Sequence, residues 1–422
     1  MLEKIWQYKD LRYKIIVVFA LLVVSRIIAH IPLPGVDLLA LRNFFGQNQI
    51  FGLLNMFSGG TLSNFSIALM GVGPYITASI VFQLLGMIWP KIEELQKEGE
   101  SGRRKINQYT RLLTVPLAII QGYSMLFLLK SQGILQSWTI YQLIIMLISI
   151  TAGSLILMWI GEIITEKGIG NGVSLIISIG ILSGLPTQIR NTASLISVGD
   201  VGKIISLIAF ILITILVVAV IVLITEGQRN IPVSYARRSR GIKSYSNVET
   251  FLPVRVNTAG VIPIIFAMSL MVIPGVLAKF LTSSKTVWIV SSAEFTDKLF
   301  KNNLFYGIFY FFLVVAFTYF YTSVVFKPDQ VAENLQKQGG FIPGIRPGSE
   351  TIKFLANTVI RITLTSSIFL GLIAVLPFIV QAITKVNTLV IGGTGILIVV
   401  SVVIETYSQL MAQLSTHTYE NY

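Results

Sequence analysis

The chain has 422 residues, of which 54% are hydrophobic and only 12% are charged, and its net charge is +13. A soluble domain carries about 25% charged residues, so this composition excludes an ordinary soluble protein. The absence of cysteine excludes disulfides, thiolate metal sites and lipidation on cysteine.

Ten apolar stretches follow one another along the chain. They cover residues 15–31, 67–89, 112–129, 139–160, 173–189, 204–224, 256–278, 304–326, 362–383 and 386–404. Most are long enough for a helix to cross about 30 Å of hydrocarbon. The first has no small-residue cleavage site and is followed by further spans, so it is not a signal peptide. Continuous apolar runs argue against a lipid-spanning barrel. The sequence therefore predicts an all-α membrane protein with ten transmembrane helices.

The basic residues predict the orientation. The amino terminus, the carboxyl terminus and every second gap together hold 22 of the 32 Lys and Arg residues, whereas the other gaps hold 9. Basic loops stay on the cytoplasmic side during insertion, so we expect both termini there. Three gaps on that side, residues 90–111, 226–255 and 327–361, are too long to be simple helix connections. We expect them to form a docking surface for an acidic or large partner.

The spans divide into two halves of five, residues 1–189 and 190–422. An odd number of spans in each half forces the second half to be inverted in the membrane. The second span of each half carries a matching interruption, Gly71 to Pro74 in one and Gly260 to Pro263 in the other. A packing kink would explain one such site. Matched breaks in inverted halves, together with glycine-rich segments at 168–172 and 391–395, indicate a central pathway instead.

Nothing in the sequence predicts an enzyme or a bound cofactor. The two histidines, His30 and His417, have no metal-ligand or catalytic partner at useful spacing. No GxxxxGK[ST] motif is present, so the chain has no phosphate-cradling loop of its own. The carboxylates Glu162, Glu166, Glu226 and Glu405 fall at span ends, which argues against a mid-membrane ion relay.

The residues beside the breaks are branched and apolar, and taken singly each is typical of packing or lipid contact. Gathered along the proposed pathway, they predict a constriction that excludes ions by dewetting. The segment Leu53–Ser66 precedes the second span and mixes apolar with small polar residues. It is either an ordinary outer loop or a short half-helix folded back into a cavity.

Several long motifs then occur in a recognisable order: NMFSGG, GPYITASI, KEGESGRRKINQYTR, GEIITEKGIGNG, VNTAGVIPIIFA and ENLQKQGGFIPGIRPG. Over residues 10–405 the chain resembles the SecY family of bacterial-type protein-conducting channels. The resemblance implies an hourglass of ten helices in two pseudo-symmetric halves, hinged on the outer side between spans five and six. It also implies work with SecE and SecG, with SecA or the ribosome as the source of energy, on signal-bearing precursors that pass to the outside or into membrane lipid.

The resemblance assigns four groups of residues. A pore ring is implied at Val72, Ile76, Ile177, Ile181, Ile265 and Ile398. A plug is implied at Leu54, Asn55, Met56, Phe57, Ser58, Gly59, Gly60, Thr61, Leu62 and Ser63. A polar cluster of a lateral gate is implied at Thr77, Gln121 and Asn257, and docking positions for SecA or ribosomes at Arg237, Arg238, Arg240 and Arg346.

Two alternative functions remain open from the residues. The inverted repeat alone would also suit a secondary transporter of a small solute, and the chain could instead be a lipid-facing insertase without full translocation. A bacterial plasma membrane is the expected location. The tail LMAQLSTHTYENY has no basic residue, unlike many family members, which leaves a plastid or accessory variant as an alternative.

Overall fold

The computed structural model describes residues 8–33, 61–62, 64–131, 135, 139–194, 201–235, 250–281, 287–384 and 393–420. Each of the ten predicted apolar stretches overlaps a helix, which agrees with the predicted all-α membrane fold. These helices are α2 (Lys9–Ile28), α5 (Gly73–Ile88), α7 (Glu100–Ser131), α8 (Ile140–Lys167), α9 (Gly172–Ser194), α10 (Val201–Glu226), α11 (Ile262–Leu281), α13 (Asn303–Val325), α15 (Ser349–Thr384) and α16 (Gly393–Glu420). Five helices in the described ranges are long and apolar enough to span a membrane, or up to six if the bent pair formed by α5 and α6 (Pro90–Lys97) is one span.

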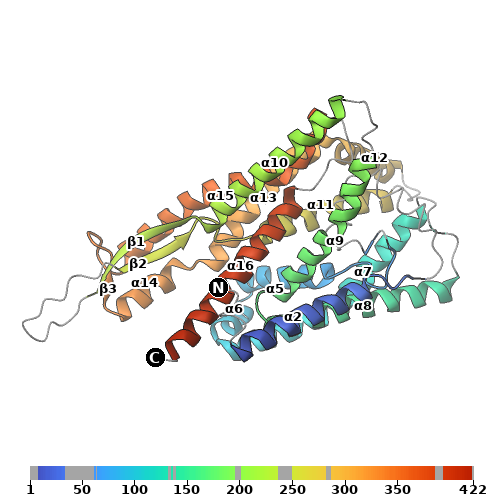
Figure 1. The fold of residues 1–422 in the computed structure, drawn as a ribbon. Coiled ribbons are helices and arrows are strands. Elements are labelled where there is room, and N and C mark those ends of the chain that lie inside the picture. The colour runs from blue at the N-terminus through green and yellow to red at the C-terminus, as the bar shows by residue number, and fades with distance from the viewer. Residues whose placement is uncertain are drawn as a thin grey trace, which may run out of the picture.

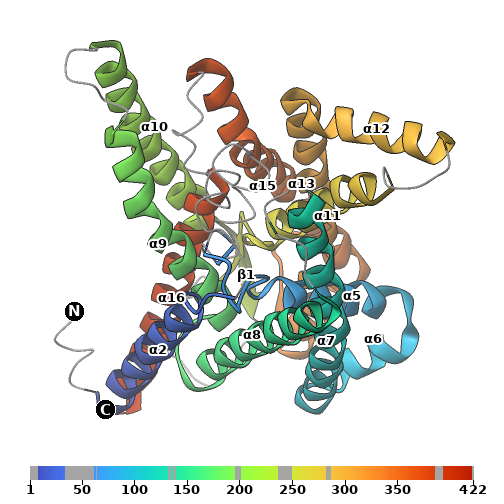
Figure 2. The same ribbon diagram turned by 90° about the vertical axis from the view of Figure 1, so that its right-hand side faces the viewer.

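The long helices form one elongated bundle (Figures 1 and 2). In the view along the bundle, α2, α9, α10 and α16 lie on one side (Figure 2). Helix α5 packs along α7, α13 packs along α15, and α11 contacts both α5 and α7. The contacts of α11 with α5 and α7 join the two predicted halves on the side away from α10.

A small sheet occupies one end of the bundle, which we call the sheet end (Figure 1). Its strands are β1 (Gln228–Tyr235), β2 (Thr250–Arg255) and β3 (Gly340–Phe341), in the antiparallel order β2-β1-β3. Ile231 of β1 lies opposite Leu252 of β2 and turns inward, into an apolar cluster with α14 (Pro328–Lys337) and the start of α15. Large loops were expected here from the gap lengths, but the sheet was not.

The two predicted interruptions are helix starts rather than kinks within helices. Gly71 and Gly260 both adopt left-handed backbone angles, with φ of 54° and 64°. Pro74 and Pro263 follow in the first turns of α5 and α11, where the missing N–H of proline removes no helical hydrogen bond. The first residues of the predicted stretches 67–89 and 256–278 are therefore irregular, and the regular helices begin at 73 and 262.

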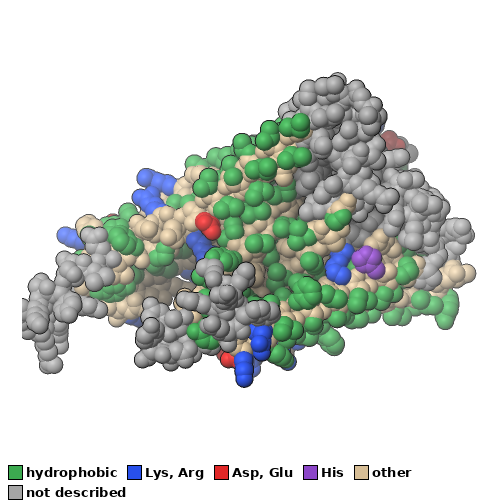
Figure 3. Space-filling model, viewed as in Figure 1, with side chains coloured by type: hydrophobic (Ala, Val, Ile, Leu, Met, Phe, Trp, Pro, Cys, Tyr) green, Lys and Arg blue, Asp and Glu red, His purple; other side chains and the backbone are tan. Residues whose placement is uncertain are grey.

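The surface follows the same division (Figure 3). On the face shown, hydrophobic side chains cover the middle of the bundle, and most of the visible Lys and Arg side chains lie toward the sheet end. At the opposite end, the short helix α12 (Val287–Lys301) lies between α11 and α13 in the chain. It runs crosswise to the bundle axis, as the view along the bundle shows (Figure 2). This pattern suits a chain whose middle contacts lipid.

Candidate functional site

The six predicted ring residues belong to one continuous apolar cluster. Val72, Ile177, Ile181 and Ile398 are buried in it, and Ile76 and Ile265 are partly buried and pack against it. They come from four helices, α5, α9, α11 and α16, and so from both predicted halves. None of the six is scattered on the lipid-facing surface.

Each ring residue lies at the start or in the first half of its helix. Val72 is the N-cap of α5, and Ile265 lies in the first turn of α11. Ile177 and Ile181 lie one turn apart near the start of α9, and Ile398 lies near the start of α16. A Cβ built on Gly395 would come 3.3 Å from Cγ2 of Ile181, so α16 approaches α9 closely beside these residues. Gly170, just before α9, lies against Thr406 and Gln409 of α16, so the two helices run antiparallel and the start of α16 lies beside Ile181.

Only the end of the predicted plug is described. Residues 54–60 and 63 lie outside the described ranges, whereas Thr61 and Leu62 are buried. The Thr61 hydroxyl donates to the Leu69 carbonyl at 3.3 Å, and Leu62 joins a cluster with side chains of α7 and α8. Phe65, fully buried, has a φ of 43°, and its carbonyl accepts from the N–H of Leu33. The segment that follows the predicted plug is therefore anchored in the half that contains α2, α7 and α8.

The predicted gate residues form two separate hydrogen-bonded pairs. Gln121 Nε2 of α7 donates to Thr77 Oγ1 of α5 at 3.3 Å. Asn257, which precedes α11, instead accepts from Ser366 Oγ of α15 at 3.4 Å, and both side chains are buried. The buried Nδ2 of Asn257 has no partner in the described part of the chain. There, no hydrogen bond joins Asn257 to Thr77 or Gln121, so each pair lies within one half. No sequence motif points to Ser366.

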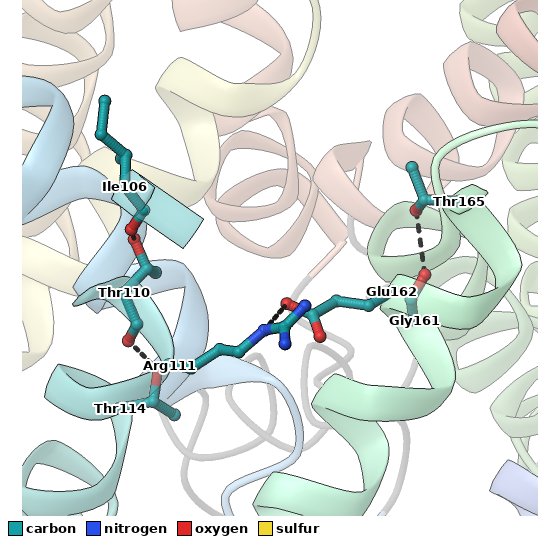
Figure 4. Close-up of polar contacts among 7 residues, drawn as sticks. All are labelled: Ile106, Thr110, Arg111, Thr114, Gly161, Glu162 and Thr165. Carbon is teal, nitrogen blue, oxygen red and sulfur yellow. Dashed lines mark hydrogen bonds and ion pairs between the residues drawn. The ribbon is translucent and has the colours of Figure 1, made fainter. Parts of the chain in front are cut away.

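An ion pair links α7 to α8 near this region (Figure 4). Arg111 Nε donates to Glu162 Oε1 at 2.9 Å, with Arg111 40% and Glu162 14% exposed. The neighbouring threonines Thr110, Thr114 and Thr165 donate to carbonyls of their own helices and need no further partner (Figure 4). Glu162, which the sequence placed at a span end, pairs with an arginine 51 residues away, and no local pattern indicates that partner.

Of the predicted docking residues, Arg346 is described, and Arg237, Arg238 and Arg240 lie outside the described ranges. Arg346 is exposed in the turn between β3 and α15, and its carbonyl accepts from Thr351 Oγ1 at 2.9 Å. Hydrogen bonds from Lys97 and Lys337 lower the pKa of the exposed Glu93 and Glu333 at the same end. The sheet end therefore presents a structured, charged surface.

Helix α16 packs against residues of the other predicted half at the sheet end. Helix α16 continues well past the apolar stretch that ends at 404, and Leu414 packs against Leu11 of α2. Gln413 Oε1 accepts from Lys14 Nζ at 3.2 Å, and Gln409 Oε1 accepts from the backbone N–H of Gly170 at 2.9 Å. The non-basic tail is thus, through Ser415 at least, part of a folded seam between α16, α2 and the 168–172 turn.

Comparison with known proteins decides the family. The family model SecY matches residues 66–407. The chain belongs to the SecY family. SecY translocase subunits of Streptomyces scabiei and Thermus thermophilus are each 40% identical to it, over 98% and 100% of this chain and 97% and 98% of theirs. The resemblance inferred from the motifs is therefore confirmed.

Solved structures share the fold. A protein-conducting channel superposes with a TM-score of 0.64 at 20% identity, covering 94% of this chain and 91% of the other. The canine Sec61 channel from a ribosome complex gives 0.61 at 20% identity, with the same coverage of 94% and 91%. These likenesses confirm the SecY-type all-helical channel architecture. The SecY relatives are named protein translocase subunits. The apolar helices described above agree with a multi-pass membrane location.

Proposed function

We propose that this chain is a passive protein-conducting channel, which translocates signal-bearing polypeptides and releases hydrophobic segments sideways into lipid. The observation that carries the proposal is that six branched apolar side chains, from both predicted halves, belong to one apolar cluster. A collar of such side chains has no fixed polar groups to bind a substrate. It can therefore part for a polypeptide of any sequence while holding back hydrated ions.

The lateral exit would lie between α5 and α11, with Thr77, Gln121 and Asn257 at its polar cluster. Both helices begin at glycine and proline breaks and contact each other. A signal sequence is a short apolar helix that gains free energy on leaving water for lipid. Opening this seam would let it partition sideways. Residues 54–63 would serve as the plug, with their described end fastened to α7 and α8.

The driving force would come from a partner, SecA or the ribosome, with SecE and SecG as membrane subunits. The sheet end, with Arg346 and the loop that contains Arg237, Arg238 and Arg240, would be the docking surface, and this end would face the cytoplasm together with both termini. The excess of basic residues on that side supports this orientation. The two halves would be residues 1–189 and 190–422, in a bacterial plasma membrane.

The test uses vesicles that contain this chain with SecE. A signal-bearing precursor should enter only when SecA and ATP are present. Photo-crosslinkers at Ile76 and Ile265 should capture a stalled precursor, whereas a crosslinker at the exposed Ile308 of α13 should capture lipid instead. A precursor that labels neither ring position would contradict the ring, and gradient-driven uptake of a small solute without SecA would favour a secondary transporter.

A further inference from the structure

Helix α12 carries an exposed apolar face that the proposed channel activity does not use. Trp288 is 80% exposed and Phe295 is 64% exposed. They are seven residues apart, so they lie within about 20° of each other around the helix axis. Large apolar side chains that share one exposed face of a short helix mark a contact surface.

The rotation of α12 about its axis is fixed by its other side. Ala293 is buried, and the ring of Phe300 packs edge-on against Phe305 and Phe309 of α13, with centroid distances of 5.9 and 6.0 Å. Phe300 also packs against the central apolar cluster. Trp288 and Phe295 therefore point away from the bundle for a structural reason and are not free to turn inward.

The helix is divided into an apolar and a charged sector. The apolar sector runs from Phe295 and Trp288 on the exposed side to Phe300 and Ala293 on the packed side, over about 160° of the helix circumference; it contains no charged residue, and its polar residues are Ser292 and Thr296. Glu294 lies in the remaining sector and is exposed, as is Lys298, whose long side chain can reach water from the sector's edge. This arrangement buries one part of the apolar sector in protein and leaves the adjoining part open.

Polar side chains near the open face satisfy their own hydrogen bonds. Ser292 Oγ donates to the Trp288 carbonyl at 2.9 Å, and Thr296 Oγ1 donates to the Ser292 carbonyl at 2.9 Å. Hydroxyls that bond back to their own helix need no water, so this face tolerates an apolar surrounding. Exposure of Trp288 and Phe295 to bulk water would be unfavourable in free energy.

The open face is continuous with lipid-facing surface. Helix α12 leads into α13, whose Leu304, Ile308 and Phe312 are 71%, 51% and 64% exposed on one side of a candidate span. In the view along the bundle, α12 lies across the other helices and projects beyond them (Figure 2). A helix that lies across the spans at their end is placed at the level where hydrocarbon meets water, which is where tryptophan is enriched.

We propose that α12 is an interfacial anchor: Trp288 and Phe295 insert into the headgroup boundary of the bilayer, at the end opposite the sheet, and Glu294 and Lys298 face water. The ligand is the lipid surface itself. Because α12 directly follows α11, the anchor ties the far end of that helix to the membrane surface. The inference needs only the membrane location of the chain and stands whether or not α11 lines a lateral exit.

The chain has no cysteine, so single cysteines can be labelled without removing others. Trp288→Cys, Phe295→Cys, Glu294→Cys and Lys298→Cys each carry a nitroxide in lipid vesicles, and collision with oxygen is compared with collision with a water-soluble nickel chelate. Positions 288 and 295 should favour oxygen, which concentrates in hydrocarbon, and positions 294 and 298 should favour the chelate. Equal access of the chelate to all four positions would overturn the proposal. Shielding of 288 and 295 from both reagents, with immobilised spectra, would also overturn it by showing a protein partner on this face.

A second measurement guards against a labelled variant that fails to fold. The chain has five tryptophans, so replacement of the other four by phenylalanine leaves Trp288 as the sole emitter. Brominated lipids should quench its emission, and acrylamide in the water should quench it weakly. Efficient quenching by acrylamide with no effect of brominated lipids would refute insertion.

Discussion

Ser366→Ala should make the proposed gate harder to open. In the parent chain, Ser366 donates to Asn257 Oδ1 at 3.4 Å, while Asn257 Nδ2 is buried without a partner in the described part of the chain. Removing the Ser366 hydroxyl leaves both polar atoms of the Asn257 side chain unpaired. A buried amide without partners is costly, so we expect Asn257 to turn toward a new partner, and we take Gln121 as that partner because α11 contacts α7. That new hydrogen bond would cross from one half to the other.

The size of the effect follows from hydrogen bonds between membrane helices. They contribute about 0.6 kcal/mol on average and about 1.7 kcal/mol at most. The closed state should therefore gain a factor of about 3 on average and about 20 at the upper limit. Because the bond from Ser366 is long and weak, little is lost in breaking it, and the average value for one new bond is expected.

The assay compares transport of two precursors, one with an intact signal sequence and one whose apolar core is shortened. The shortened signal supplies less free energy for opening, so Ser366→Ala should depress its transport by about threefold and affect the intact precursor less. Ser367→Ala is the matched control, because Ser367 is equally buried but donates to its own helix at Leu364 O, 2.9 Å away. Adding Gln121→Ala to Ser366→Ala should restore transport, because it removes the acceptor across the seam. Faster transport of the shortened precursor by Ser366→Ala, or no restoration in the double variant, would refute the reasoning.

Three further changes test other parts of the structure. Glu162→Gln breaks the ion pair between α7 and α8. Because the arginine partner is 40% exposed, the loss of stability should be about 1 kcal/mol, measured as a modest fall in Tm. An unchanged Tm would show that the pair does not contribute to stability. Gly170→Ala places a Cβ on a residue whose φ is 90°, only 2.9 Å from Thr406 Oγ1. It should lower the free energy of unfolding by about 1–3 kcal/mol and loosen the seam with α16. Gly184→Ala, with open space around it, should be neutral or slightly stabilising. Arg346→Ala should leave Tm unchanged and reduce SecA-driven transport, and full transport would contradict its proposed docking role.

Much of the site follows from local sequence. The glycine and proline pairs at 71–74 and 260–263 mark where α5 and α11 begin, because only glycine enters the left-handed region freely and only the first turn accepts proline without loss. The same patterns indicated a pathway lined by the branched apolar residues beside the breaks, and the family resemblance assigned Val72, Ile76 and Ile265 to it. The error concerned the nature of the breaks: hydropathy counts apolar residues whether or not they are helical, so both stretches were assigned residues that precede the helices.

The sequence by itself determined the order of the spans, the gaps in which basic residues gather and the family. Hydrophobic length and charge are local properties on which membrane insertion depends, and motif order can be read directly from the chain. Only the tertiary structure decided which side chains meet. Asn257 bonds to Ser366, 109 positions away, the tail of α16 closes on α2, and β3 joins a sheet more than 100 residues after β1. Such contacts depend on how whole helices pack against each other, and the periodicity of a single helix records which face is apolar but not which neighbour covers it.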